Sequence, residues 1–447
     1  MGQHAIGPVT PLTSRRLLAR LARVQRDGRL PSVVAGLVRD GELAWSGGYG
    51  DVPGDPVDLQ YRIGSITKTV TAVLVLQLVD EGLLGLDDPL ESVLGDVGYG
   101  DRPVRELLAH DSGMQAEPHG SWWERSEGVS FEELVAANDG STRAFDPRER
   151  FHYSNLGYGL LGEVVARLRG APWWECAQAR VLGPLGMVRT TYLPQQPCVD
   201  GFSVHPYAGT LTPEPATDTA AMAPAGQLWS TVGDLATYAR FLLDGHPDVL
   251  SRAWLDRMAT PRAGAAATGL DSAYGLGLQL LAGGSGTVVG HGGSMPGFLA
   301  ACFVDRSRRT GAVLLANATT GLPTSTTGVA LLEDLEDQEP SVVHAWKPNV
   351  QVPGRFAELL GVWHWGNTPH VFELDGDQLV VRLRGVATYR FAEQHGRIVG
   401  VEGYQAGEEL HVVRREDGSV SHLDLATFVF TREPYDATAP VPGGAPD

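Results

Sequence analysis

Ser65 and Lys68 are the first pair of residues in this sequence whose types and spacing could do chemistry. They stand in the string Gly-Ser-Ile-Thr-Lys, where an extended segment enters a long apolar helix predicted over 66–82. Residues three apart share a helix face, so the lysine amine can point at the serine hydroxyl and accept its proton. The chain has only two lysines, Lys68 and Lys347, and lysine, unlike arginine, can lose its proton in a protein. A serine at a helix start can also be a plain N-cap.

Two further groups of polar residues stand near the ends of predicted elements. Tyr-Ser-Asn at 153–155 lies in a loop before a helix predicted over 156–169, where Tyr153 could simply pack its ring and Asn155 could cap the helix. His-Gly-Gly-Ser at 291–294 ends a predicted strand, and its glycines would let another chain segment approach closely. Each group alone fits an ordinary structural role, so their combination carries the information.

In this order the three groups resemble the penicillin-binding protein and class C β-lactamase family of serine enzymes. The motifs of that family are S-x-x-K, Y-x-N, and K-T-G or its variant H-x-G, which stand here as SITK, YSN and HGG. The surrounding sequence is similar too, including ELLAHDSGM at 106–114 and GHGGSMPGF at 290–298. The resemblance covers about residues 15–335.

The resemblance implies a role for each motif residue. Ser65 is the nucleophile, and either Lys68 or a Tyr153 phenolate takes its proton; the sequence does not choose between these two paths. Tyr153 also protonates the leaving group. The backbone N–H groups of Ser65 and Ser294 stabilise the oxyanion. Asn155 holds the substrate amide or the Lys68 side chain.

His291 stands where the peptidoglycan and β-lactam enzymes have a lysine that helps to hold a substrate carboxylate, and a neutral imidazole is a weaker anchor. This favours the esterase, D-aminopeptidase and transacylase branches over a β-lactamase or a D-Ala-D-Ala carboxypeptidase. Gly293 is expected on the substrate and oxyanion side of the site. Trp122 and Trp123 are further candidates for the cleft, although loop tryptophans often serve packing, and Arg62 is expected to be structural.

The elements that position these residues come from both ends of the first 340 residues. A helix over 10–28 and a hairpin turning at Asp40-Gly41 come first, and short strands separated by glycine begin at 274. Helices lie between, and 205–225 is expected to be an extended loop. This order predicts an α/β (α+β) sandwich with a mostly antiparallel sheet. The other predicted helices are 103–110, 131–138, 172–182, 231–244, 251–259 and 322–336.

A second domain is predicted after the catalytic one. Beyond 354 the chain consists of short strands with hairpin turns at the Asp-Gly pairs 375–376 and 417–418, which is typical of a small all-β, lipocalin-like barrel. The predicted boundaries are 1–338 for the catalytic domain, 339–353 for a linker, 354–432 for the β-domain and 433–447 for a flexible tail.

Composition narrows the class of partner. The formal net charge of −18 argues against nucleic acid and membrane partners, since both need a basic face. The N-terminus lacks the apolar region of a secretory signal, so a cytoplasmic location is expected. The partner is a small-molecule or peptide substrate such as a peptidyl thioester, with no cofactor and no metal. The cysteines make no ligand or disulfide pattern and are interpreted as small core residues: Cys176, Cys198 and Cys302.

Three functions remain open. The first is a serine hydrolase or acyltransferase acting on an ester or amide, for example a peptide with a D-residue. The second is a stand-alone thioesterase that cyclises a nonribosomal peptide, because some of these enzymes combine such a catalytic domain with a lipocalin-like domain; D-aminopeptidases of the family also carry β-barrel appendages. The third, a binding protein with a decayed site, is disfavoured because every chemistry-bearing residue is present. An α/β-hydrolase is disfavoured because no G-x-S-x-G elbow occurs.

Overall fold

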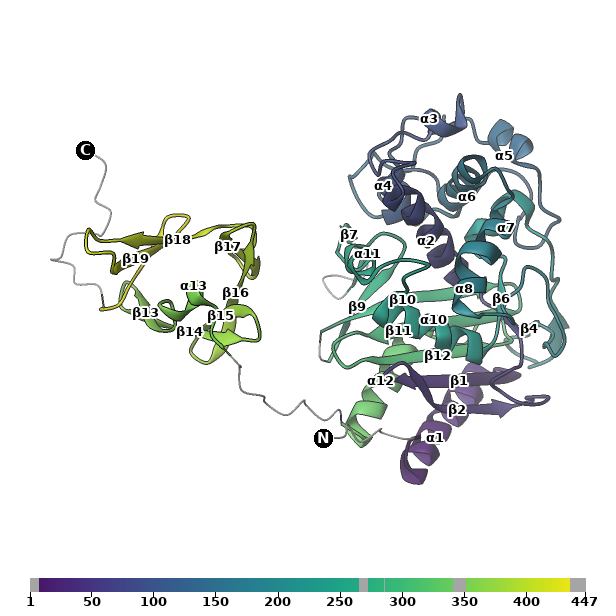
Figure 1. The fold of residues 1–447 in the computed structure, drawn as a ribbon. Coiled ribbons are helices and arrows are strands. Elements are labelled where there is room, and N and C mark those ends of the chain that lie inside the picture. Colours follow the sequence, from purple (N-terminus) through teal and green to yellow (C-terminus); the bar gives the residue numbers. More distant parts are fainter. Residues whose placement is uncertain (1–7, 265–271, 285, 341–350, 435–447) are drawn as a thin grey trace. The chain divides into compact units, whose positions relative to one another are not determined.

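Figure 1 shows the computed structural model, which describes residues 8–264, 272–284, 286–340 and 351–434. The chain divides into two compact units, residues 1–342 and 343–447. Most of the predicted linker, 339–353, and of the predicted tail, 433–447, lies outside the described residues. Within the described ranges, no helix is both long and apolar enough to cross a membrane.

The first unit is built on one eight-stranded antiparallel sheet in the order β2-β1-β12-β11-β10-β9-β8-β7. Its strands come from both ends of the unit, as predicted, and Val33 of β1 pairs with Ala316 of β12. Every residue of β1, β11 and β12 is buried, so the centre of the sheet is covered on both faces. The strands are β1 (Ser32–Arg39), β2 (Glu42–Gly50), β7 (Ala263–Gly264), β8 (Ser272–Tyr274), β9 (Gln279–Gly283), β10 (Gly286–Met295), β11 (Phe298–Asp305) and β12 (Thr310–Ala316).

Two helices from opposite ends of the unit, α1 (Pro11–Gly28) and α12 (Thr324–Gln338), cover one face of this sheet (Figure 1). Leu17 and Leu21 lie one turn apart on α1, and both enter the apolar cluster on this face. This spacing explains why the N-terminal segment folds as an amphipathic helix against the sheet, as the sequence predicted.

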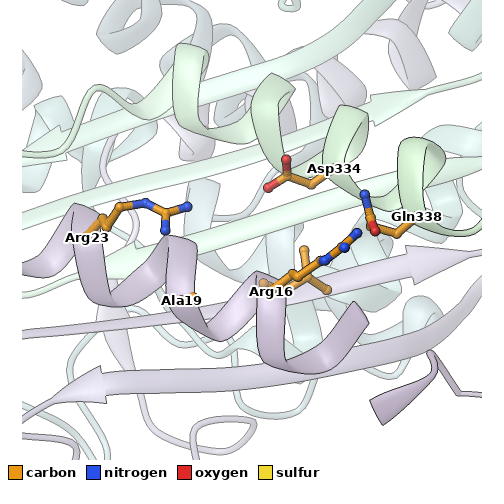
Figure 2. A pocket seen from close by; sticks show the side chains of 6 residues that line it. Arg16, Ala19, Arg23, Asp334 and Gln338 are labelled. Atoms are coloured by element: carbon orange, nitrogen blue, oxygen red, sulfur yellow. The ribbon is translucent and has the colours of Figure 1, made fainter. Parts of the chain in front are cut away.

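A groove runs between α1 and α12, and Figure 2 shows it from close by. Arg16 and Arg23 extend from α1, and Asp334 and Gln338 from α12. Arg20 joins the two helices through an ion pair with Asp334. The groove therefore lies on the face of the sheet opposite to the motif residues.

The other face carries α2 (Ile66–Asp80), α6 (Asn155–Arg169) and α10 (Val232–Asp244). Every side chain of α2 from Ile66 to Leu78 is buried, which makes it a core helix that is buried on all sides. Its first turn is therefore held inside the fold. The remaining helices of this unit are α3 (Glu91–Leu94), α4 (Val104–Ala109), α5 (Phe131–Ala137), α7 (Trp173–Ala177) with a π-helical turn (Gln178–Leu182), α8 (Gly183–Leu185), α9 (Ala223–Gly226) and α11 (Arg252–Met258).

The segment 205–225 is more structured than the predicted extended loop. It includes β5 (Leu211–Pro213), which pairs with β4 (Phe202–Val204), and it leads through a 3-10 turn into α9. Such short elements depend on tertiary contacts that local composition does not report. A second two-stranded ribbon joins β3 (Tyr61–Arg62) to β6 (Trp229–Ser230). The cysteines are unpaired, and their burial differs: Cys176 and Cys302 are buried as expected, whereas Cys198 is half-buried.

The second unit is a nearly closed eight-stranded antiparallel barrel, which confirms the predicted all-β class. Its first and last strands pair with each other, and a bridge between Val399 and Glu409 links the two ends of the sheet. Apolar side chains, including Trp363, Phe391 and Phe356 of α13 (Gly354–Ala357), fill the interior. The strands are β13 (Gly361–Trp365), β14 (Thr368–Asp375), β15 (Gln378–Leu383), β16 (Val386–Gln394), β17 (Arg397–Glu402), β18 (Leu410–Arg414), β19 (Val420–Leu425) and β20 (Phe428–Thr431).

Candidate active site

Ser65 and Lys68 are in hydrogen-bond contact at the start of α2. Lys68 Nζ donates to Ser65 Oγ at 3.0 Å and to the carbonyl oxygen of Ala225, in α9, at 2.6 Å. Ser65 occupies the N-cap position, but its hydroxyl makes no capping bond. Lys68 is fully buried, whereas Ser65 is half-buried. The serine hydroxyl is therefore the part of the pair that a substrate can reach.

Burial changes the acid–base chemistry of Lys68. Removal from water lowers the pKa of its amine to about 7, while the carboxylates of Glu117 and Glu124 act in the opposite direction. At pH 7 about half of the molecules then carry a neutral amine, against roughly one in 3,000 for an ordinary lysine. A neutral amine in contact with a hydroxyl can accept its proton.

Tyr153 lies beside this pair. Lys68 Nζ is 5.0 Å from the centre of the Tyr153 ring. Its phenol oxygen is buried and, within the described part of the chain, has no partner in hydrogen-bond geometry. Burial raises the pKa of Tyr153 above its ordinary value, and the nearby Ser65 hydroxyl lowers it by less. A phenol with a raised pKa keeps its proton, which favours Lys68 over Tyr153 as the base.

Two glycines bring the backbone of β10 against the start of α2. A Cβ on Gly293 would lie 1.9 Å from the carbonyl oxygen of Ile63 and 3.3 Å from the nitrogen of Ser65. A Cβ on Gly64, whose φ is +51°, would lie 2.6 Å from the nitrogen of Ser294. The two backbones therefore touch directly, which places the N–H groups of Ser65 and Ser294 in one region. No acceptor among the described residues takes the Ser65 N–H, which leaves it available to an oxyanion.

His291 lies in β10, and the His-Gly-Gly-Ser group forms the last part of this strand before Met295, as predicted. Its ring is 1% exposed, and both ring nitrogens are engaged: Nδ1 donates to the carbonyl oxygen of Gly292, and Nε2 accepts from the Tyr274 hydroxyl at 2.8 Å. Burial lowers the pKa of His291 to about 3, so the ring is neutral. A contact between the imidazole and substrate stays a prediction that this geometry does not favour.

Asn155 is held by a carboxylate that the sequence analysis missed. Its Nδ2 donates to Glu117 Oε1 at 2.7 Å, and Trp123 Nε1 donates to Glu117 Oε2 at 2.8 Å. One N–H of the Asn155 amide is thus bonded to Glu117, whereas Lys68 bonds to Ser65 and Ala225, and the expected contact of Asn155 with a substrate amide stays a prediction. α6 is capped by Ser154. Glu117 itself is exposed, so it presents a fixed negative charge beside the nucleophile. No local pattern marks it, because both partners meet it only in the folded chain.

Trp122 and Arg62 differ in surroundings. Trp122 is 60% exposed, donates to Glu124 at 3.1 Å and lies under the guanidinium of Arg125. Arg62 is buried and donates to Gln227 at 2.9 Å, which agrees with the structural role expected for it. The described residues contain no cluster of three or more His, Cys, Asp or Glu side chains able to hold a metal ion.

These residues form one site on an α+β sandwich. The site combines a serine at the start of a buried helix, a lysine on the same helix face, a tyrosine beside both and two converging backbone amides. The fold and this site define the class shared by penicillin-binding proteins and β-lactamases, as the sequence predicted.

Comparison with known proteins names the family. The Beta-lactamase family matches residues 17–334, and a domain of unknown function (DUF7586) matches residues 352–432. The chain belongs to the β-lactamase family. It is 28% identical over 256 residues to Beta-lactamase-like protein 2 of Dictyostelium discoideum, covering 53% of this chain and 46% of that protein. The chain thus spans about half the length of the first curated relatives that it matches.

Two solved structures are also similar. A D-stereospecific amidohydrolase from Streptomyces sp. is 28% identical with a TM-score of 0.62, over 74% of this chain and 99% of that chain. SurE is 26% identical with a TM-score of 0.61, over 94% of this chain and 99% of that chain, and a further structure contains SurE with D-Leu. The second likeness extends over both units of the present chain.

Proposed function

We propose that this protein is a serine amidase or esterase that forms an acyl-enzyme at Ser65. The observation that carries the proposal is the contact between Ser65 Oγ and a buried Lys68 amine that can be neutral near pH 7. In the first half-reaction Ser65 Oγ attacks the carbonyl carbon and its proton passes to Lys68 Nζ. The amides of Ser65 and Ser294 stabilise the oxyanion, which is worth roughly 3 kcal/mol per donor in other serine enzymes.

Breakdown of the tetrahedral intermediate needs a proton for the leaving group. Tyr153 is suited to give it, because burial keeps its phenol protonated, and the Lys68 ammonium can then return a proton to Tyr153. The scissile bond breaks as the leaving amine or alcohol departs with that proton. Water then attacks the acyl-enzyme and gives its proton to Lys68; the bond to Ser65 Oγ breaks, Ser65 takes the proton back from Lys68, and the acid product leaves.

The preferred acyl donor carries a D-residue with a free amino group. The Streptomyces relative is a D-stereospecific amidohydrolase, and SurE was solved with D-Leu, which supports the D configuration. The exposed Glu117 carboxylate, fixed by Asn155 and Trp123, supplies a partner of the right charge for an ammonium group next to the scissile carbonyl.

A second candidate is transfer of the acyl group to an amine of the same substrate. The observation that favours it is the barrel unit, since some stand-alone thioesterases that cyclise nonribosomal peptides combine this catalytic domain with a lipocalin-like domain. Hydrolysis and cyclisation share the acyl-enzyme and differ only in the acceptor.

Intact-mass spectrometry with matched acyl donors tests the proposal. The donors are p-nitrophenyl esters and amides of D- and L-phenylalanine, their N-acetyl forms, a penicillin, a fluorophosphonate and a peptidyl thioester, each with wild type and Ser65→Ala. We expect an adduct that is lost in Ser65→Ala and fastest turnover with the D-donor bearing a free amine. Equal labelling of wild type and Ser65→Ala would show that Ser65 is not the nucleophile. A cyclic product from the thioester would select the second candidate.

A further inference from the structure

We propose that His110 is a positioning residue that holds Tyr153 in place for proton transfer; this inference rests on the proposed serine chemistry. His110 directly follows α4, and its ring is fully buried. It contacts three consecutive residues of the segment before α6. Its carbonyl oxygen accepts the N–H of His152 at 2.7 Å, its ring lies 4.2 Å from the Tyr153 ring, and its Nδ1 accepts the N–H of Ser154 at 3.0 Å.

These three contacts fix both the backbone and the ring of Tyr153. The N–H groups of His152 and Ser154 are both bonded to His110, so the backbone is restrained on each side of Tyr153. The imidazole then supports one side of the phenol ring at an interplanar angle of 34°. The phenol ring also lies near Lys68 and the Ser65 hydroxyl, and the contacts with His110 restrain its backbone and its ring from the other direction along the chain.

The backbone conformation of His110 is a second, independent observation. Its φ is +57°, in the left-handed region that a helix C-terminus usually fills with glycine. A β-carbon there is strained, and such strain is maintained where the side chain is needed. A histidine at this position is explained by the Nδ1 hydrogen bond to Ser154 and the ring contact with Tyr153, which glycine could not make.

His110 acts as a neutral ring. Its Nδ1 accepts a hydrogen bond, so the ring proton lies on Nε2, which has no partner within the described residues. Burial, with the charge of Lys68 and the rings of His291 and His152 nearby, lowers its pKa. The other ionisable side chains packed on it are the hydroxyls of Tyr153, Tyr158 and Tyr274. Its contacts with Tyr153 are a ring contact and hydrogen bonds to the neighbouring backbone, which suit a positioning role.

Three substitutions separate the effects of the His110 ring and of its Nδ1 acceptor on catalysis. His110→Asn keeps an acceptor for the Ser154 N–H and removes the ring, whereas His110→Phe keeps a ring and removes the acceptor. His110→Gly removes both the acceptor and the ring, and it relieves the strain of a β-carbon at positive φ. The matched control is His395→Gly, because His395 has a φ of +51° and lies exposed in the barrel unit. The readouts are kcat and KM for a p-nitrophenyl ester, and the thermal midpoint.

We expect His110→Gly to lower kcat roughly 100-fold with KM changed less than threefold, at the lower end of what proton transfer contributes. His110→Asn and His110→Phe should each recover part of this loss, and His395→Gly should match wild type. Combined with Tyr153→Phe, the His110 substitutions should cause no further loss, because residues that act through one group are not additive. Fluorophosphonate labelling of Ser65 keeps slow variants measurable.

Two outcomes would overturn the inference. One is wild-type kcat in His110→Gly with Ser65 still labelled. The other is an equal fold-loss from His110→Gly in the presence and absence of Tyr153, which would mean a general structural effect. Absence of any labelling of wild-type Ser65 is a different result, because it would refute the proposed function itself.

Discussion

The inner layer of the site and its rim are held by different means. The inner layer (Gly64, Ser65, Lys68, Gly293 and Ser294) is held by direct backbone contact, where a Cβ on Gly64 or Gly293 would collide, and its lysine is fully buried. The rim (Glu117, Trp122, Trp123 and Glu124) is fixed by side-chain hydrogen bonds, and both Glu117 and Trp122 are exposed. We therefore expect the inner layer to perform the chemistry of the proposed function and the rim to select the substrate.

The sharpest test of this division is Lys68→Arg, which keeps the charge and removes the ability to accept a proton. We expect a loss of roughly 10³-fold in the rate of Ser65 acylation, the size typical of a lost general base. The rate of fluorophosphonate labelling measures it, with the thermal midpoint as a control for folding. A labelling rate within tenfold of wild type would indicate that Tyr153, and not Lys68, is the base.

Gly293→Ala should produce the next largest effect. The new Cβ would meet the carbonyl oxygen of Ile63 at 1.9 Å, so β10 must shift away from α2 and the two amides would separate. We expect kcat to fall roughly 10²-fold, as when one oxyanion donor is lost. Gly284→Ala is the control, because its Cβ would meet nothing closer than 3.8 Å. Similar losses in both variants would contradict a role of this contact in catalysis.

Glu117→Gln probes the rim and is expected to change selectivity more than chemistry. KM for a donor with a free amine should rise roughly tenfold, the size of one charge-assisted bond, with little change for its N-acetyl form.

The pH profile of Glu117→Gln gives a second readout. Activity should rise with pH through about 7 as Lys68 loses its proton; Glu117 raises that pKa, so Glu117→Gln should move the limb to lower pH. Equal changes of KM for the free-amine donor and its N-acetyl form would show that Glu117 does not bind the ammonium group.

The smallest effect is expected at Trp122. Its side chain is 60% exposed, donates to Glu124 of the rim and lies under the guanidinium of Arg125. Trp122→Ala should change kcat/KM less than about threefold for small donors, since surface substitutions away from special features cost little. A loss above tenfold would show that the rim and the inner layer are coupled, and would weaken the division drawn between them.

The sequence predicted the parts of the site that depend on local spacing. Ser65 and Lys68 share a face because a helix repeats every 3.6 residues, and the order of elements predicted a sheet joined from both ends. Glu117 could not be found in this way, because its partners Asn155 and Trp123 reach it only through tertiary contacts. The sequence also could not show that the His291 ring is hydrogen-bonded, because its partner Tyr274 comes from another strand.

The pairing of β1 with β12 also has a consequence for synthesis of the chain. Val33 and Ala316 are separated by about 280 residues, so β1 leaves the ribosome long before its partner exists. At typical elongation rates the delay is roughly 15–55 s. During that time β1, which is buried throughout in the folded chain and mostly apolar, has only β2 of its hairpin beside it, and an unpaired edge of this kind is prone to aggregate. The yield of soluble protein should therefore depend on translation speed and on chaperones that cover the nascent hairpin.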